Sequence, residues 1–142
     1  MPRLFDKFPF IQKPAQTPTR RVISRASRNY SPIEVMFWNA YTAMRPRALR
    51  GLVRQHQTGR YRIDFALPAQ RFGIELDGHA THSSPAAIAA DRRRQRELEE
   101  MGWHIVRFGG QEVYQDAAVC VRSAARLAAL HKMRSKGGRT RT

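Results

Sequence analysis

The chain has 142 residues, the length of one compact domain, and its 26 lysine and arginine residues against 11 acidic residues give a formal net charge of +15. Hydrophobic residues make up 42% of the chain, which argues against disorder throughout. The single cysteine, Cys120, excludes an intrachain disulfide framework and fits a reducing cytoplasm. No apolar run is long enough to span a membrane, so we expect no membrane partner.

The positive charge is concentrated near the two ends of the sequence. Residues 1–30 hold seven basic residues and one acid, about +6, and residues 131–142 hold five basic residues and no acid, about +5. The residues between them hold fourteen basic residues and ten acids, about +4. Basic segments bind polyphosphates by releasing condensed counterions, which makes a nucleic acid the expected partner. A basic solubilising or ribosome-associated tail has the same composition, and charge alone does not separate the two.

Residues 1–30 are expected to form a flexible basic arm, because four prolines interrupt regular structure there. The folded part begins at Ser31, a helix N-cap residue. Pro32 follows it at the first helical position, and Glu34 stands three positions after the cap. Apolar residues then recur about once per turn, which predicts an amphipathic helix to about Arg45.

Polar and apolar patterns, interrupted by glycine and proline, predict the remaining elements. Strands are expected at residues 52–57, 61–67, 71–77 and 103–108, and helices at residues 85–101 and 112–132. Residues 31–132 then form one domain, and the basic tail 133–142, which lacks an apolar anchor, is expected to be disordered. The order α-β-β-β-α-β-α predicts an α/β fold, a mixed β-sheet flanked by helices on both faces.

Three acidic residues stand out in the two central strands. Glu75 and Asp77 are two positions apart, so they face one side of the sheet, while Leu76 faces the other. Pairing with the preceding strand brings Asp64 alongside them. Three crowded carboxylates repel one another, and a divalent cation such as magnesium or manganese would relieve that repulsion. The alternative is three solvated acids on an exposed sheet face, although acids are poor strand formers.

The residues around these acids, taken in order, resemble the PD-(D/E)XK nuclease superfamily. More narrowly, they are similar to small endonuclease-domain proteins related to very short patch repair (Vsr-like) endonucleases. The matching residues are Gln55, Tyr61-Arg62-Ile63-Asp64-Phe65, Ile74-Glu75-Leu76-Asp77-Gly78, His82, Asp91, Arg94, Leu98, Gly102-Trp103 and Arg107-Phe108. The resemblance runs from about Ser31 to Leu130. It implies a restriction-endonuclease-like core, a magnesium requirement, phosphodiester hydrolysis and a role in DNA repair.

The resemblance also assigns roles to single residues. It implies that Asp64 and Glu75 are acidic metal ligands. Asp77 stands where the wider superfamily has a lysine, and an aspartate cannot stabilise negative charge on the attacked phosphate as a lysine would. Vsr-type enzymes have a histidine there and a second one five residues on, where this chain has His82. We therefore expect His82 to be the general acid or base; the alternative, as for His79, is a solvated loop histidine.

Three further residues have two interpretations each. Glu34 resembles the helix glutamate that approaches the metal-bound water in this superfamily, but a capping box alone needs a glutamate at that spacing. Gln55 either contacts the phosphate or orients a water, or it is an ordinary polar strand residue. Asp91 shares a helix face with apolar residues and needs a partner. Arg94 or Arg107 can supply that partner, in a structural ion pair rather than a metal site.

We therefore expect a magnesium-dependent (or manganese-dependent) DNA endonuclease, with Asp64, Glu75 and Asp77 as the metal ligands. One alternative is a nucleic-acid-binding module of the same fold that does not cleave, which the missing lysine favours. Another is a basic RNA- or ribosome-associated protein, which would have no functional need for the three acids. The sequence does not determine which DNA structure is cleaved, the number of metal ions or the oligomeric state.

Overall fold

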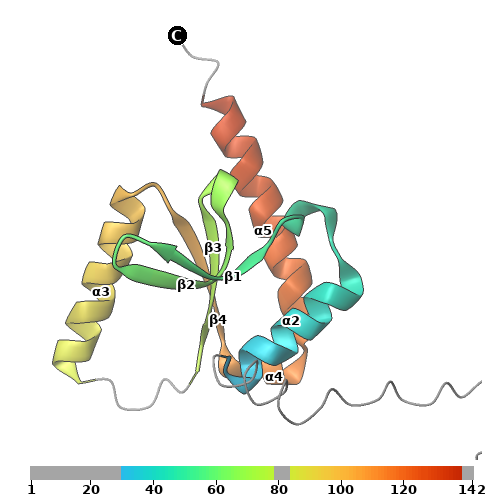
Figure 1. Cartoon of the computed structure of the whole chain (residues 1–142), viewed down its shortest axis with the longest axis horizontal. Coiled ribbons are helices and arrows are strands. Elements are labelled where there is room, and N and C mark those ends of the chain that lie inside the picture. The colour runs from blue at the N-terminus through green and yellow to red at the C-terminus, as the bar shows by residue number, and fades with distance from the viewer. Residues whose placement is uncertain (1–29, 79–83, 139–142) are drawn as a thin grey trace, which may run out of the picture. The chain divides into compact units, whose positions relative to one another are not determined.

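The computed structural model describes residues 30–78 and 84–138. In these residues four strands form one sheet in the order β1-β2-β3-β4 (Figure 1). Their bounds are β1 (Val53–Thr58), β2 (Tyr61–Leu67), β3 (Phe72–Asp77) and β4 (His104–Gly109). The pairs β1–β2 and β2–β3 are antiparallel, and β3–β4 is parallel. The predicted mixed sheet, with a fourth strand reached through a helix, is confirmed.

Helices cover both faces of this sheet (Figure 1). On one face lie α2 (Pro32–Met44), α4 (Gly110–Gln115) and α5 (Ala117–Gly137), and on the other lies α3 (Pro85–Glu100). Two short 3-10 helices, η3 (Arg47–Leu49) and η4 (Pro68–Gln70), lie in the connections before β1 and after β2. Among the described helices, none has both the length and the apolar character needed to cross a bilayer.

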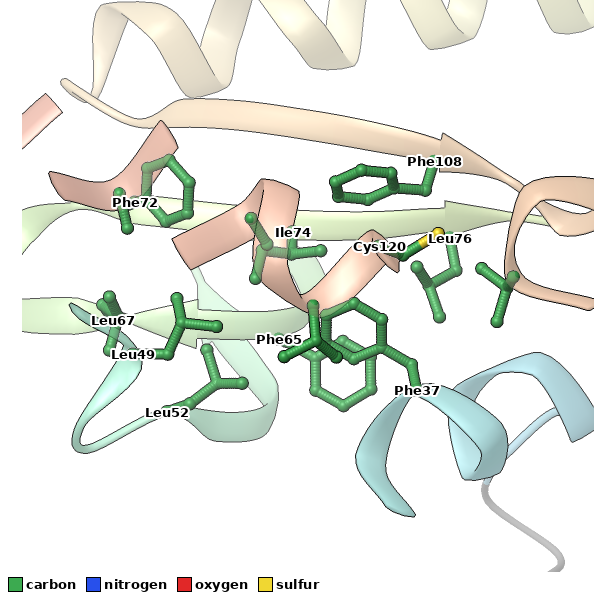
Figure 2. Packing of buried hydrophobic residues seen from close by; sticks show 14 of the residues in the cluster. Phe37, Leu49, Leu52, Phe65, Leu67, Phe72, Ile74, Leu76, Phe108 and Cys120 are labelled. Carbon is green, nitrogen blue, oxygen red and sulfur yellow. The ribbon is translucent and has the colours of Figure 1, made fainter. Parts of the chain in front are cut away.

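The hydrophobic core is divided by the sheet into two clusters. The larger one joins β2, β3 and β4 to α2, α4 and α5, with Phe37, Phe65 and Phe72 fully buried (Figure 2). The smaller one, on the α3 side, consists of Ile63, Ala66, Leu98 and Trp103. Burial of this apolar area stabilises the sheet between its helix layers, at roughly 25 cal/mol per Å² removed from water. The carboxylate-bearing strands β2 and β3 are therefore held from both sides.

Local sequence signals explain where α3 begins and ends. Ser84 is the N-cap, and its side chain accepts a hydrogen bond from the backbone N–H of Ala87 at 3.2 Å. Pro85 occupies the first helical position, where a missing N–H costs nothing. The helix stops at Met101, and Gly102 follows with φ +86°, a left-handed conformation that glycine adopts without a Cβ clash.

The predicted helix over residues 112–132 was wrong in its bounds. Asp116 adopts an extended conformation (φ −161°, ψ 94°), which ends α4, and its carboxylate accepts a hydrogen bond from the N–H of Val119 at 3.1 Å, which caps α5. Residues 133–137, predicted as disordered tail, continue α5 to Gly137. A helix that is already anchored needs no further apolar contact to continue, and basic residues in its last turn favour its C-terminal dipole.

We predict that Gly73→Ala destabilises the fold by about 1–3 kcal/mol through overpacking. A Cβ at this position in β3 would lie 2.5 Å from Cδ1 of Ile105 and 2.9 Å from Cγ2 of Ile63, inside the smaller cluster. The matched control is Gly137→Ala, where a Cβ would meet nothing within 4 Å and we expect a neutral or slightly stabilising effect. Urea unfolding of both variants measures the difference. Equal stability of the two variants would contradict this packing.

Candidate active site

Strand β1 changes the face to which its side chains point at Gln55. Arg54 places its guanidinium 4.0 Å from the ring centroid of Trp38 on α2. Two residues later, His56 contacts the ring of Trp103, which belongs to the cluster on the α3 side. Residues i and i+2 of a regular strand share a face, so the change requires an irregular residue between them. Gln55 supplies it with φ 49°, a left-handed conformation that costs a non-glycine residue about 1–3 kcal/mol.

Strand β2 makes the same change at Asp64. Ile63 packs in the smaller cluster beside α3, whereas Phe65 packs in the larger cluster beside α2 and α5. The register pairs residue 54 with 65 and residue 56 with 63, so Gln55 and Asp64 stand opposite each other. In both strands the side chains therefore switch from one face of the sheet to the other at the same place, which is occupied by Gln55 in β1 and Asp64 in β2. Backbone strain retained at such a point is typical of functional sites.

Glu34 of α2 contributes a third polar group at this point. Its carboxylate accepts a hydrogen bond from the side-chain amide of Gln55. Only 8% of Glu34 is exposed, which is unusual for a glutamate. The structure thus joins two residues for which the sequence allowed two interpretations each. In it, the side-chain amide of Gln55 holds the carboxylate of Glu34.

Asp64 is the most perturbed carboxyl group of the site. Its pKa is raised to about 6, chiefly by burial and also by the charges of Glu34 and Glu75, against the lowering effect of the backbone N–H of Leu76 and the guanidinium of Arg94. The hydrogen bond from the Leu76 N–H to Oδ2 of Asp64 is 2.9 Å long and ties β2 to β3. Three carboxylates therefore lie near enough to act on one another, as the sequence predicted for Asp64 and Glu75.

Glu75 is held by two arginines from different elements. Arg94 of α3 donates from both terminal nitrogens to the two carboxylate oxygens, with Nη1 2.8 Å from Oε2. Arg107 of β4 places Nη2 3.4 Å from Oε2 of Glu75. Only 6% of Glu75 is exposed, so its charge is neutralised by the arginines rather than by water.

Asp91 of α3 forms an ion pair with Arg107, one of the two arginines that contact Glu75. It accepts two hydrogen bonds from Arg107, at 2.8 and 2.9 Å, so the predicted structural ion pair is confirmed, with Arg107 as its partner. Sequence reasoning missed that Arg94 and Arg107 both engage Glu75. The available signal was that a buried strand carboxylate needs a cation, and Arg94 lies three positions after Asp91 on the same helix.

Asp77 lies on the same side of β3 as Glu75 but at the exposed end of the strand. Burial raises the pKa of Asp77 above its usual value, although the neighbouring Arg107 acts to lower it. In the described part of the chain, no three acidic, histidine or cysteine side chains converge as a ready-made cation site. The carboxylate oxygens of Glu75 face arginines instead. His79 and His82 lie outside the described residues, so the role expected of His82 stays a prediction.

The chain resembles several known proteins. A model of the restriction-endonuclease-like family REase_MTES_1575 matches residues 40–127, more than half of the chain. YcjD of Escherichia coli (strain K12) is 43% identical over 60 residues, which are 42% of this chain and 49% of YcjD. Rv2248 of Mycobacterium tuberculosis (strain ATCC 25618 / H37Rv) is 35% identical over 68 residues, 48% of this chain and 24% of that protein. The chain thus matches about half or less of the length of these relatives.

A solved structure has the same fold. The catalytic domain of the homing endonuclease I-Bth0305I superposes with a TM-score of 0.56 at 17% sequence identity, covering 72% of this chain and 98% of that domain. The α/β architecture is therefore endonuclease-like, as the sequence predicted. The narrower similarity to Vsr endonucleases is not tested by these matches and stays a prediction.

We predict that Asp64→Asn stabilises the protein in EDTA at pH 7 and that the gain disappears at low pH. A pKa raised from 3.8 to about 6 means that the folded state holds this proton more tightly than the unfolded chain. The free energy of unfolding of wild type therefore falls by up to about 3 kcal/mol as the pH rises from 3.8 to about 6, and this carboxyl causes no further loss above that pH. Asparagine keeps the oxygen that accepts from Leu76 but has no charge.

Thermal melts of both proteins from pH 4 to pH 8 test this. The exposed acid Glu100, changed to glutamine, is the matched control, and we expect its melting temperature to follow that of wild type. A difference in melting temperature between Asp64→Asn and wild type that does not change with pH would contradict a raised pKa for Asp64.

Proposed function

Because the chain belongs to the restriction-endonuclease-like family REase_MTES_1575, we propose that it is a metal-dependent endonuclease that hydrolyses phosphodiester bonds in DNA. One observation carries the proposal: Asp64, a half-buried carboxyl with a pKa raised to about 6, lies beside the buried carboxylates of Glu34 and Glu75. Such a concentration of negative charge in a protein of net charge +15 is typical of a site built for a cation.

The donor atoms suit Mg²⁺ or Mn²⁺ by their chemistry. Asp64 and Glu75 offer hard carboxylate oxygens, and Asp77 adds another on the same side of β3. When bound, the ion lowers the pKa of a water molecule and neutralises charge on the phosphate. Arg94 engages both oxygens of Glu75, so an ion that binds this carboxylate has to compete with the guanidinium for them.

The two arginines supply the positive charge that Asp77 cannot. The wider superfamily has a lysine at the position of Asp77, and here the cations nearest to Glu75 come instead from α3 and β4. A guanidinium binds a phosphate through two parallel hydrogen bonds as readily as it binds a carboxylate. Arg94, which donates to both carboxylate oxygens, is therefore the residue we assign to the scissile phosphate once Glu75 is engaged elsewhere.

Glu34 and Gln55 form a fixed hydrogen-bonded pair beside Asp64. We assign this pair to orienting the attacking water, since a carboxylate held by an amide presents its remaining lone pairs in a defined direction. The resemblance to Vsr endonucleases assigns proton transfer to His82.

A second candidate is a nucleic-acid-binding module of the same fold that does not cleave. Two observations favour it: an aspartate replaces the lysine, and Glu75 is held by arginines. A cleavage assay separates the candidates. The substrates are intact duplex, mismatched, branched and single-stranded DNA, each with Mg²⁺, Mn²⁺ or EDTA.

We predict that wild type cleaves at least one of these substrates only with a divalent cation, and that Asp64→Asn and Glu75→Gln each lower the rate by more than about 100-fold. Changes to groups that merely support a metal ligand already cost about 10–100-fold, and these changes remove a ligand. Glu100→Gln is the matched control, an exposed acid outside the site, and should cleave at the wild-type rate. Cleavage by Asp64→Asn at the wild-type rate would refute the assigned site.

We also predict that His82→Ala lowers the cleavage rate by about 10²–10⁴-fold, whereas His79→Ala does so by much less. The wild-type pH–rate profile should bend near pH 6–7, where an unperturbed imidazole titrates, and His82→Ala should lose the bend. An unchanged bend together with a raised magnesium requirement would contradict the role in proton transfer.

A further inference from the structure

A basic surface lies at the end of α2 that is remote from Glu34. Two adjoining hollows, of about 620 and 690 Å³, share the side chains of Arg47 and Arg50 as a common wall. Their cationic lining consists of Arg45, Arg47, Arg50, Lys132 and Lys136, all of them exposed. We call these five residues and the two hollows between them the basic groove.

The charge of the basic groove is not balanced locally. Among the described residues, none that lines either hollow is acidic. The arginines of α3 differ in this respect, because Arg92, Arg93 and Arg96 are followed on the same helix by Glu97, Glu99 and Glu100. An uncompensated cluster of cations on a concave surface attracts a polyanion, with a strength that depends on salt.

The segment that carries three of these arginines is fixed by its own contacts. Arg45 ends α2 in the left-handed conformation (φ 44°), and its backbone N–H donates to the carbonyl of Tyr41 at 2.8 Å. Leu49 of η3 is fully buried, and its carbonyl accepts from the Tyr41 hydroxyl at 3.2 Å. A backbone fixed in this way loses little conformational entropy when a ligand binds.

The position of the basic groove relative to the candidate active site suits a continuous nucleic acid. Helix α2, whose course Figure 1 shows, connects the two. Glu34, which acts on Asp64, lies in its first turn, and Arg45 of the basic groove follows its last residue. At 1.5 Å per residue the helix spans about 16 Å between these points. That distance corresponds to about five base pairs of B-DNA at 3.4 Å each.

We propose that the basic groove binds the phosphodiester backbone of duplex DNA about five base pairs to one side of the scissile phosphate. This inference rests on the proposed function, because the scissile phosphate is located by Asp64 and Glu75. The basic groove makes the footprint asymmetric about the cleavage point, and it contributes affinity without reading sequence.

Binding of duplex DNA across a salt series tests the proposal, measured by fluorescence anisotropy with the full chain in an Asp64→Asn background. Replacing Arg45, Arg47 and Arg50 together by glutamine should make the negative slope of log K against log salt less steep. The expected change is about 0.9 for each phosphate that the variant no longer neutralises, up to about 2.7. The matched control, Arg92, Arg93 and Arg96 to glutamine, removes the same formal charge from α3 and should change the slope less. Melting temperatures establish that both variants fold.

A second arm varies the DNA. Duplexes too short to extend about five base pairs from the candidate active site to the basic groove should bind the Asp64→Asn background protein as weakly as the full-length duplex binds the groove variant. Equal slopes for the groove variant and the unaltered background protein, or a larger decrease in the α3 control, would overturn the proposal. Dependence on the groove for single-stranded RNA but not for duplex DNA would overturn the choice of ligand. Because no cleavage is needed, failure of the proposed catalytic function leaves this readout unaffected.

Discussion

The candidate site depends on the neutralisation of one buried carboxylate. Glu75 lies inside the sheet, and two arginines, one from α3 and one from β4, hold it. Burying an unpaired carboxylate would cost several kcal/mol, so these arginines fix how α3 packs against the sheet. Arg107 in turn is held by Asp91, so a single network ties the helix to both parallel strands. Asp64 lies next to this network, close to Glu75, and its pKa is raised mainly because burial disfavours its charged form, with a further contribution from the neighbouring carboxylates.

If the chain binds a divalent ion as proposed, two kinds of cation compete for Glu75. An arginine or a divalent ion can neutralise the carboxylate, but the oxygens that Arg94 engages are the oxygens that would bind the ion. Under the proposed function, this exchange would supply the positive charge that a lysine supplies at the position of Asp77 in the superfamily that the sequence resembles. If Glu75 turns to an ion, the freed guanidinium lies beside the carboxylates, where a phosphate would be attacked. Positive charge then comes from a neighbouring helix instead of from the strand itself.

Short-range patterns in the sequence were enough to predict much of this fold. The two-residue spacing of Glu75 and Asp77 placed both on one face, and the element order predicted the mixed sheet, because both depend on local periodicity and chain connectivity. The partner of Glu75 was not predictable in this way: Arg94 could equally have paired with Asp91, and the packing of α3 on the sheet decides between them. The left-handed conformation of Gln55 could not be predicted from the local sequence, because glutamine rarely adopts it and nothing next to it in the sequence indicates it. The break at Asp116 was missed because the apolar spacing continues across it.

Calorimetric titration of Mn²⁺ into the full chain tests the central claim most directly, with wild type, Arg94→Gln and Asp64→Asn compared at one pH. If the carboxylates bind the ion and Arg94 competes for Glu75, Arg94→Gln should bind Mn²⁺ more tightly than wild type, and Asp64→Asn should bind it much more weakly. Glu100→Gln should bind as wild type does. Equal affinity in all four proteins would contradict the claim, and so would weaker binding by Arg94→Gln.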